Sequence, residues 1–235
     1  MTSRRTAVVT GATRGIGLAV TRALAPTHTV IMMARHADDL GAVAREIGDA
    51  ASPLPCDLAE ARSTTAAIDK IRAMTGGAPD LLVNNAGLFK LSTVESADPD
   101  EFSASLNINL AAPFRLIHAF LSEMKKRRSG HIVSIGSIAD RMAFPENGGY
   151  SAAKFGLRGL HAVLRSELRG SGVRSTLVSP GPVDTPLWDE VNPDERAGFT
   201  PRSAMLRPKD VAAAVLYVVS QPETVNVDEL RLARS

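Results

Sequence analysis

Two residues four positions apart could exchange a proton with a substrate oxygen. Tyr150 and Lys154 have the i, i+4 spacing that places two side chains on one face of a helix. A tyrosine hydroxyl ordinarily ionises at a pH of about 10, and a neighbouring ammonium lowers that pKa because it favours the phenolate. Ser137, which follows an expected strand, could donate a hydrogen bond to a carbonyl oxygen. The three residue types together indicate proton transfer during oxidation or reduction at a carbonyl carbon, although each also occurs in ordinary helices and loops.

Three glycines favour a nucleotide phosphate site near the N-terminus. Gly11, Gly15 and Gly17 lie between an expected strand at 6–10 and a helix that begins near residue 16. Glycine permits a tight turn and a close approach of the backbone to a pyrophosphate, and the helix N-terminus offers free N–H groups to the anion. The spacing GxxxGxG differs from the common dinucleotide pattern GxGxxG, so the alternative is a plain glycine-rich turn.

The residues after the second expected strand indicate which nicotinamide nucleotide binds. NAD-selective sites commonly carry an acidic residue there, which binds the ribose hydroxyls. Here Ala34 occupies that position and Arg35 follows it. A guanidinium suits a ribose 2′-phosphate, and Arg14 in the glycine turn could supply a second cation. We therefore predict NADP(H) rather than NAD(H); the alternative is that both arginines are ordinary surface residues.

Two further strand ends carry polar residues that suit a bound nucleotide. Asp57 follows the third expected strand and could accept a hydrogen bond from the adenine amino group, or cap the next helix together with Glu60. Residues 84–87 (NNAG) follow the fourth strand, and cofactors bind at the carboxyl ends of parallel strands. Asparagine and glycine there suit a backbone packed against a ribose, or simply a turn.

Short apolar runs alternate with longer segments of helical period along the whole chain. This alternation predicts a doubly wound α/β fold, a parallel sheet of about seven strands with helices on both faces, in a single domain over residues 1–235. Pro113 should break or bend the long helical stretch, and residues 186–207 form the longest expected loop. We expect strands at 6–10, 29–33, 53–56, 80–83, 131–135, 173–178 and 227–232, and helices at 16–25, 38–47, 59–74, 99–128, 150–170 and 208–220.

The composition excludes several classes of protein. The 235 residues carry 27 basic and 25 acidic side chains, and 44% are hydrophobic, which excludes disorder as the main state. The basic run at 125–128 suits the end of a helix rather than a nucleic-acid site. The single cysteine, Cys56, cannot form an intrachain disulfide, and the apolar runs are too short for a membrane span or a signal peptide. We expect a cytoplasmic protein without nucleic-acid or membrane partners and without a bound metal.

The order and spacing of these motifs resemble those of the short-chain dehydrogenase/reductase family over nearly the whole chain. The matching segments are TGATRGIG at 10–17, CD at 56–57, NNAG at 84–87, NINL at 107–110, SIGS at 134–137, YSAAK at 150–154 and PGPVDT at 180–185. The resemblance implies a sheet of Rossmann type and four catalytic residues. Tyr150 would be the general acid or base, and Lys154 would lower its pKa and hold the nicotinamide ribose. Ser137 would orient the substrate oxygen, and Asn109, rather than its neighbour Asn107, would support a water in the proton relay.

The resemblance also implies how NADP(H) is held and how the chain assembles. Pro180, Gly181 and Thr185 would close over the nicotinamide, and the Val183 backbone would bind the carboxamide. Gly136 stands where many relatives have a serine, a departure that leaves the spacing to Tyr150 intact. A homodimer through the helices at 111–128 and 150–170, or a homotetramer, is the expected assembly. The full expected cofactor-binding set is Gly11, Thr13, Arg14, Gly15, Ile16, Gly17, Arg35, Asp57, Leu58, Asn85, Ala86, Gly87, Tyr150, Lys154, Pro180, Gly181, Val183 and Thr185.

The segments expected to line the substrate pocket, 88–93, 138–149 and 186–205, are largely apolar. They favour a hydrophobic ketone, aldehyde or secondary alcohol, so the leading hypothesis is an NADP(H)-dependent carbonyl reductase. Arg141 and Lys90 could instead meet an anionic substrate, which leaves a 3-oxoacyl thioester reductase open, and a pterin reductase is a further alternative. A hypothesis of another class is a regulator that binds NADP(H) without turnover. The complete set of catalytic residues argues against it.

Overall fold

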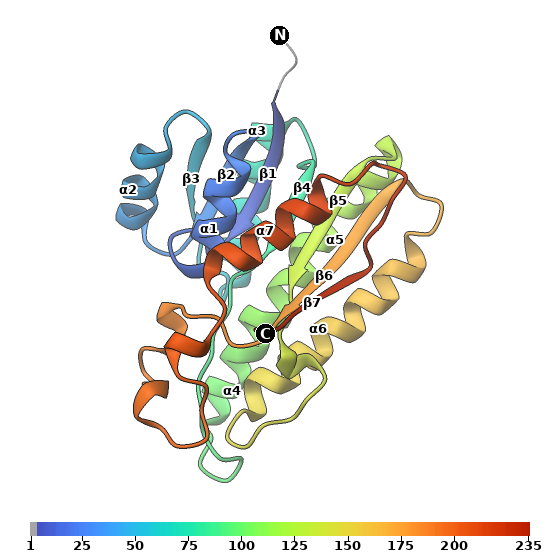
Figure 1. Cartoon of the computed structure of the whole chain (residues 1–235). Helices are drawn as coiled ribbons and strands as arrows, with labels where there is room; N and C mark the ends of the chain where they lie inside the picture. The colour runs from blue at the N-terminus through green and yellow to red at the C-terminus, as the bar shows by residue number, and fades with distance from the viewer. Residues whose placement is uncertain (1–3) are drawn as a thin grey trace.

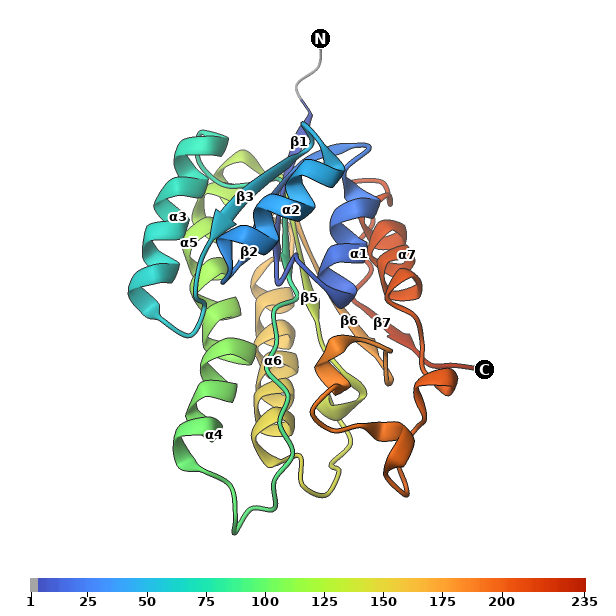
Figure 2. The same cartoon turned by 90° about the vertical axis from the view of Figure 1, so that its left-hand side faces the viewer.

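The computed structural model describes residues 4–235 and has a parallel sheet with helices on both faces (Figure 1, Figure 2). The strand order is β3-β2-β1-β4-β5-β6-β7, and every neighbouring pair is parallel. This arrangement confirms the predicted doubly wound sheet of Rossmann type. The strands are β1 (Arg5–Thr10), β2 (His28–Ala34), β3 (Ala51–Pro55), β4 (Leu81–Asn84), β5 (Gly130–Ile135), β6 (Val173–Pro180) and β7 (Glu229–Leu232).

Successive side chains of the central strands enter two separate cores, one on each face of the sheet. In β1, Val8 shares a core with α3 (Ala61–Thr75), α5 (Ala112–Arg127) and α6 (Gly148–Glu167). Val9 shares the other core with α1 (Gly15–Leu24), α2 (Ala37–Ile47) and α7 (Pro208–Val219). Both valines are fully buried, and burial of a side chain of this size stabilises a fold by about 1.5–3 kcal/mol. The continuous apolar runs of the sequence therefore belong to strands that are covered on both sides.

Most elements begin or end within three residues of the prediction, and at α3 and β3 the difference has a local reason. α3 begins at Ala61 with Glu60 at its N-cap, so the alternative in which Asp57 and Glu60 cap this helix is wrong. The Asp57 carboxylate instead accepts a hydrogen bond of 2.9 Å from the Ala59 N–H, which closes a turn before the helix. β3 extends back to Ala51 although it contains two prolines, because it is an edge strand, where proline is tolerated.

The long helical stretch is interrupted just before Pro113 rather than at it. A π-helical turn, Asn107–Ala111, separates α4 (Pro99–Leu106) from α5. In an α-helix, the N–H of residue 113 would bind the carbonyl oxygen of Asn109, and proline has no N–H. The Asn109 carbonyl oxygen therefore lacks its α-helical donor, and the wider turn lies where that bond is missing.

The irregular residues 186–207, called the lid below, lie at the lower end of the molecule, beyond the carboxyl end of β6 (Figure 2). They contain three single-turn 3-10 helices rather than an unstructured loop. Arg202 anchors the lid through Asp184, at 3.0 Å, and Asp189, at 2.7 Å. Arg234 donates a hydrogen bond of 3.0 Å to the Met205 carbonyl oxygen and so ties the lid to the segment after β7.

The basic run at 125–128 ends α5, as predicted, and it binds neighbouring backbone. Arg127 donates hydrogen bonds to the carbonyl oxygens of Ala78 (2.8 Å) and Pro79 (2.6 Å), and Arg128 donates to that of Gly170 (3.0 Å). These bonds give the run a structural role at the helix end. Within residues 4–235, none of the helices combines the length and the apolar character that a bilayer crossing requires.

Candidate active site

Three of the expected catalytic side chains meet beyond the carboxyl end of β5. Ser137 follows that strand and caps a short 3-10 turn, because its hydroxyl accepts a hydrogen bond of 3.1 Å from the Ala139 N–H. Tyr150 and Lys154 lie one turn apart near the N-terminus of α6, and Lys154 Nζ is 5.4 Å from the centre of the Tyr150 ring. Lys154 is 4% exposed and donates a hydrogen bond of 2.8 Å to the Ile135 carbonyl oxygen. This bond holds the ammonium at the end of β5, beside the tyrosine.

Burial controls the protonation of this pair. It raises the pKa of Tyr150 to about 12; a hydrogen bond with Ser137 opposes the increase, and the negative charge of Asp140 adds to it. Burial lowers the pKa of Lys154 to about 8, and the Asp140 charge opposes that decrease. The sequence predicted a lowered pKa for Tyr150, whereas in the protein alone the desolvation of the phenolate dominates. Tyr150 is therefore protonated at neutral pH, which is the form that can donate a proton to a carbonyl oxygen.

Asn109 lies in the π-turn, where its side chain acts as a clamp. Its amide Nδ2 donates hydrogen bonds to the carbonyl oxygens of Leu88 (2.8 Å) and Ser105 (3.0 Å), and its Oδ1 accepts one from the Leu88 N–H (3.2 Å). The Asn107 carbonyl oxygen accepts from the Ala112 N–H. The backbone carbonyl oxygen of Asn109, which lacks its α-helical donor, is thus the group in this turn that suits a relay water.

The glycine turn after β1 forms the cradle that a nucleotide phosphate requires. Gly11 and Gly15 have φ values of 66° and 54°, in the left-handed region that favours glycine. A side chain at Gly17 would overlap the Gly11 carbonyl oxygen, so glycine alone lets α1 pack this closely on the turn. Arg14 at the N-cap of α1 makes no side-chain cap, which leaves the N–H groups at that end, including those near Ile16, to an anion. The turn, which also contains Thr13, fits a dinucleotide pyrophosphate.

Arg14 and Arg35 lie on neighbouring turns, and both are exposed. The Gly11 N–H donates a hydrogen bond of 2.8 Å to the Met33 carbonyl oxygen, so the glycine turn packs against the end of β2 directly before Ala34 and Arg35. Within residues 4–235, neither arginine side chain has an ion-pair or hydrogen-bond partner. Two unpaired cations at one strand edge, with Ala34 in the place of an acid, suit a 2′-phosphate.

The segment after β4 locks the glycine turn. The Asn85 amide Nδ2 donates a hydrogen bond of 2.8 Å to the Thr10 carbonyl oxygen, and the N–H groups of Asn85 and Ala86 each donate one of 2.9 Å to the Thr10 hydroxyl. Gly87 lies close to the clamp, since a Cβ there would be 3.0 Å from Asn109 Oδ1. The sequence assigns no role to Thr10, although this residue begins the matching segment at 10–17.

Residues 180–185 lie beside the glycine turn. The Gly181 N–H donates a hydrogen bond of 2.8 Å to the Leu232 carbonyl oxygen, which continues the pairing of Pro180 with β7. Thr185 packs on Gly15, because a Cβ at that glycine would be 3.1 Å from the Thr185 methyl carbon. The end of β6 and the first turn of α1 therefore enclose the same space.

Three remaining residues of the expected cofactor set follow strands that end at this edge. Val183 forms a parallel β-bridge with Leu206 of the lid. The Asp184 N–H donates to the Leu206 carbonyl oxygen, and the Leu206 N–H donates to the Pro182 carbonyl oxygen, so the Val183 N–H takes no part in the bridge. Asp57 and Leu58 follow β3; Leu58 is buried, and Asp57 Oδ1 closes the turn to Ala59. The Val183 N–H and Asp57 Oδ2 are therefore the groups of this set that suit a ligand.

The expected substrate segments meet as a row of aromatic rings that starts at Tyr150. The Phe89 ring lies edge-on to Tyr150, with 5.0 Å between centroids, and edge-on to Trp188, at 4.9 Å. Trp188 in turn contacts Phe199, at 6.4 Å. We call these four residues the aromatic wall. Phe89, in the segment after β4, therefore lies between Tyr150 and the lid.

An ion pair joins the lid to the opposite side of this space. Arg196 Nη2 is 2.7 Å from Glu146 Oε2, and the guanidinium lies 4.9 Å from the Phe199 ring centre. The Ser92 N–H donates a hydrogen bond of 2.8 Å to the Glu146 carbonyl oxygen, so all three expected lining segments are connected. Met205, expected in the lining, is 1% exposed and is packed in the base of the lid.

Arg141 and Lys90, the two cations that could have bound an anionic substrate, are both paired with carboxylates. Arg141 Nε is 2.7 Å from Asp140 Oδ1, and Arg141 Nη2 is 2.6 Å from Glu229 Oε1. Lys90 is paired with Glu101. Because each cation already has a carboxylate partner, the sequence argument for an anionic substrate loses its basis.

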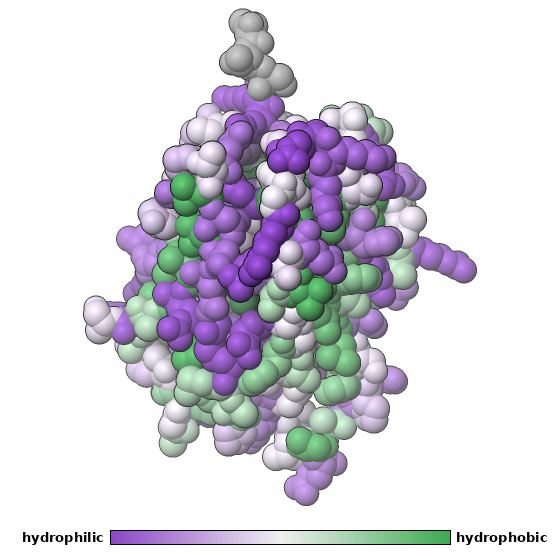
Figure 3. Space-filling view, turned by 90° about the vertical axis from the view of Figure 1, so that its right-hand side faces the viewer, coloured by the Kyte–Doolittle hydropathy of each residue, from purple (hydrophilic) through white to green (hydrophobic). Residues whose placement is uncertain are grey.

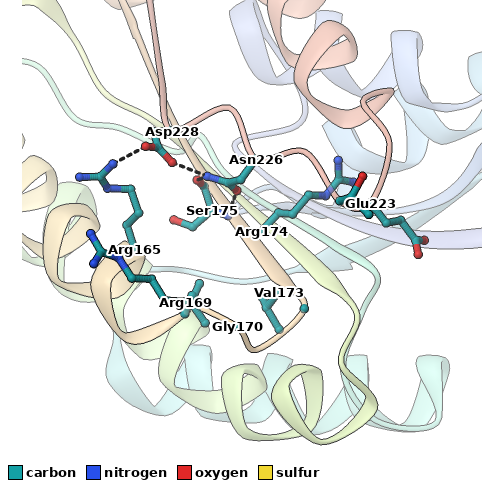
Figure 4. A pocket seen from close by; sticks show the side chains of 12 residues that line it. Arg165, Arg169, Gly170, Val173, Arg174, Ser175, Glu223, Asn226 and Asp228 are labelled. Carbon is teal, nitrogen blue, oxygen red and sulfur yellow. Dashed lines mark hydrogen bonds and ion pairs between the residues drawn. The ribbon is translucent and has the colours of Figure 1, made fainter.

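A hollow of about 330 Å³ lies away from these residues, at the amino end of β6 (Figure 4). Its guanidinium groups are largely occupied, since Arg165 pairs with Asp228 and Arg174 donates a hydrogen bond of 2.9 Å to the Gln221 carbonyl oxygen. Parallel sheets of this type bind ligands at the carboxyl ends of their strands. The candidate active site is therefore the space beside Tyr150.

A parallel sheet with a glycine turn after β1 and a Tyr-Lys pair on α6 defines the class of protein. A model of the short chain dehydrogenase family matches residues 5–196, and the chain belongs to this family. It is an oxidoreductase of the short-chain type. An uncharacterized oxidoreductase of Staphylococcus saprophyticus is 33% identical over 231 residues, which cover 96% of this chain and 95% of the relative. One from Staphylococcus aureus strain MW2 is 33% identical over 226 residues, which cover 95% and 94%.

Solved structures agree with this assignment. A metagenomic short-chain oxidoreductase in complex with NADP has a TM-score of 0.84 and 33% identity, over 98% of this chain and 97% of that one. An alcohol dehydrogenase from the archaeon Thermococcus sibiricus, complexed with 5-hydroxy-NADP, has a TM-score of 0.85 and 30% identity, over 99% and 97%. The closed form of a serine dehydrogenase complexed with NADP+ has a TM-score of 0.87 and 29% identity, over 96% and 93%.

Proposed function

We propose that this oxidoreductase uses NADP(H) to reduce an apolar ketone or aldehyde. The observation that carries the proposal is the protonated phenol of Tyr150, placed beside Ser137 and at one end of the aromatic wall. A group that is protonated at neutral pH suits the direction in which a carbonyl oxygen must gain a proton. The reverse reaction, oxidation of a secondary alcohol, needs the phenolate and should require a higher pH.

The chain's own residues have distinct roles in this reaction. The hydride for the carbonyl carbon would come from NADPH when it is bound. The Ser137 hydroxyl donates a hydrogen bond to the carbonyl oxygen, and Tyr150 gives its proton to that oxygen as negative charge develops on it. Lys154 holds the nicotinamide ribose, and its charge favours the phenolate that is left behind. The Asn109 carbonyl oxygen holds a water that returns a proton through Lys154.

NADP(H) as the cofactor is supported by the residues at the strand ends and by the three solved relatives that hold NADP, NADP+ or an NADP analogue. Arg14 and Arg35 bind the 2′-phosphate, since both are exposed and unpaired within residues 4–235. The glycine turn receives the pyrophosphate, and Asp57 the adenine. Residues 180–185 hold the nicotinamide, with the Val183 N–H bonded to the carboxamide.

The aromatic wall supports an apolar substrate with a flat or bulky group, which would lie against Phe89 and Trp188. A 3-oxoacyl thioester is less well supported because Arg141 and Lys90 are paired with carboxylates. The substrate screen described below also tests a pterin. A homodimer through α5 and α6 is supported by exposed apolar side chains on these helices, Phe114, Phe155 and Val163. Hydrophobic surface gathers in the lower half of the side of the molecule that Figure 3 shows. A cytoplasmic location stays a prediction.

The test is NADPH consumption with a panel of aromatic and aliphatic ketones, aldehydes, diketones, a pterin and an acyl thioester. We expect turnover with the apolar carbonyls. Tyr150→Phe should retain NADPH binding and lose nearly all turnover, because the ring remains and only the proton donor is removed. Tyr217→Phe is the matched control, since Tyr217 is the other tyrosine and is 54% exposed on α7. Tight NADPH binding without turnover of any substrate would instead identify a regulator.

A further inference from the structure

A buried acid without a role in the reaction described above lies next to the catalytic side chains. Asp140 is 0% exposed, although it carries a carboxylate. Its Oδ1 is 2.7 Å from Arg141 Nε, and its Oδ2 accepts a hydrogen bond of 2.5 Å from the Ser179 hydroxyl and a long one of 3.5 Å from the Ser137 N–H. A buried charge is costly unless it is paired and hydrogen-bonded, and this carboxylate is both.

The contacts of Asp140 join two parts of the active site. Asp140 and Ser137 hold each other at the ends of one 3-10 turn, because the Asp140 N–H also donates a hydrogen bond of 2.9 Å to the Ser137 carbonyl oxygen. Ser179 lies in β6 directly before Pro180 and Gly181, which we assign to the nicotinamide. Asp140 therefore connects the loop that carries the proposed substrate-orienting serine with the strand end that carries the proposed cofactor contacts.

The same carboxylate explains why residue 136 is glycine. A Cβ at Gly136 would be 2.6 Å from Ser179 Oγ and 2.8 Å from Asp140 Oδ2. Both distances are shorter than those that Cβ atoms make with neighbouring atoms in proteins. Gly136 does not have a positive φ, so close packing rather than backbone conformation requires the glycine. The resemblance to the family implies a serine at this position in many relatives. In this chain, the Asp140–Ser179 pair fills the space that such a side chain would need.

We propose that Asp140 is a positioning residue for carbonyl reduction: held by Arg141 and Ser179, it fixes Ser137 beside Tyr150 and supplies the negative charge next to the Tyr-Lys pair. The inference rests on the proposed function of Tyr150 and Ser137. Charged residues of two other elements also lie near Asp140. Arg158 of α6 donates a hydrogen bond of 2.9 Å to its carbonyl oxygen, and Glu229 of β7 reaches it only through Arg141.

Its charge gives Asp140 a signature that a purely structural residue lacks. Asp140 raises the pKa of Tyr150 and that of Lys154, since a nearby anion disfavours the phenolate and favours the ammonium. Reduction requires both groups to be protonated. Removal of the charge should therefore move the alkaline limb of the reduction profile to lower pH. Loss of packing alone would lower the rate at every pH without moving the limb.

The first experiment compares kinetics of Asp140→Asn and Ser179→Ala with those of the wild type. For Asp140→Asn we expect kcat to fall by about tenfold or more with a small change in KM, because a misplaced hydrogen-bond donor acts mainly on the transition state. The alkaline limb should move to lower pH. Ser179→Ala should give a smaller loss of kcat without moving the limb. Asp69→Asn is the matched control, since Asp69 is exposed on α3. A wild-type kcat and pH profile in Asp140→Asn would overturn the proposal.

The second experiment needs no substrate and tests the packing directly. Gly136→Ala should lower Tm by about 2–10 °C in the wild-type background, the range for an overpacked site in a chain of this size. In the Asp140→Ala background the decrease should be much smaller, because the carboxylate is gone and the Ser179 hydroxyl can rotate away. If Asp140→Ala does not fold, Ser179→Ala serves as the second background. An equal decrease in every background would refute the assigned packing.

The two experiments separate failure of this inference from failure of the proposed function. If the wild type reduces no carbonyl while Gly136 and Asp140 are coupled in Tm, the proposed activity is wrong and the packing stands. If the wild type reduces a carbonyl while Asp140→Asn behaves like Asp69→Asn, the role of Asp140 is wrong and the activity stands.

Discussion

Replacement of Arg35 by alanine should weaken NADPH binding and leave NADH binding nearly unchanged. The side chain lies one residue beyond β2, where the Gly11–Met33 hydrogen bond of 2.8 Å holds the strand end against the glycine turn. It is exposed and has no competing partner within residues 4–235. Its contribution should therefore come almost wholly from the 2′-phosphate, which NADH does not carry.

The size of the effect follows from the exposure. A hydrogen bond to a charged group contributes about 1.5–3 kcal/mol, and solvent reduces this at an exposed site. We take about 1–2 kcal/mol, which is a rise in the NADPH Kd of about 5–30-fold. Arg14→Ala should act in the same direction, and the double variant should lose most of the preference. Added salt should reduce the preference in the wild type, since both cations are screened.

The assay is titration calorimetry of NADPH and NADH, side by side, on the wild type and each variant. Arg45→Ala is the matched control, because Arg45 is also exposed and lies on α2, the helix that follows Arg35. An equal loss for both cofactors would refute the 2′-phosphate assignment. So would the same NADPH loss in Arg45→Ala, which would indicate a general effect of charge. Tighter binding of NADH than of NADPH by the wild type would show that the interpretation of the end of β2 is wrong.

Three other predictions concern the reaction, the lid and the turn. Reduction should decline as pH rises through about 8, where the buried Lys154 ammonium loses its proton, and Lys154→Arg should keep its charge and remove that decline, as a pH–rate profile would show. Glu146→Gln breaks a pair that is about one-third exposed, so KM should rise by at most about fivefold with kcat unchanged, and a larger effect on kcat would place this pair in the chemistry instead. Gly17→Ala should abolish NADPH binding, because the added carbon overlaps the Gly11 carbonyl oxygen; calorimetry that finds unchanged affinity would contradict this account of the turn.

The strands and most helices could be predicted because their signals are local. Continuous apolar runs such as 6–10 and 131–135 mark strands that are covered on both faces, and glycines mark the turn after β1. The start of α3 could not be predicted, because both Asp57 and Glu60 are plausible caps and only the turn closed by Ala59 decides between them. The position of the π-turn could not be predicted either. Pro113 predicts an interruption of the helix, but the residues around it determine where the wider turn forms.

In the candidate site too, local features could be predicted from the sequence, whereas features that depend on distant residues could not. Spacing alone pairs Tyr150 with Lys154, but the pKa of Tyr150 depends on burial, which one sequence does not show. The partner of Arg141 illustrates the same difficulty, since Glu229 lies far along the chain and meets it only because β7 joins the sheet beside β6. The role of Asp140 cannot be predicted from the sequence either, because two of its partners are distant in the chain: Ser179 of β6 binds its carboxylate, and Arg158 of α6 binds its carbonyl oxygen.

The aromatic wall gives the protein an intrinsic fluorescent probe at the proposed reaction centre. Trp188 is the single tryptophan of the chain, and it lies on the lid with its ring 4.9 Å from Phe89, which in turn contacts Tyr150. All indole emission therefore originates beside the proposed reaction centre. Reduced nicotinamide absorbs light in the range where indole emits, so energy transfer from Trp188 would follow NADPH arrival without a label. Movement of the lid would change the same signal, and stopped-flow fluorescence could time it against turnover.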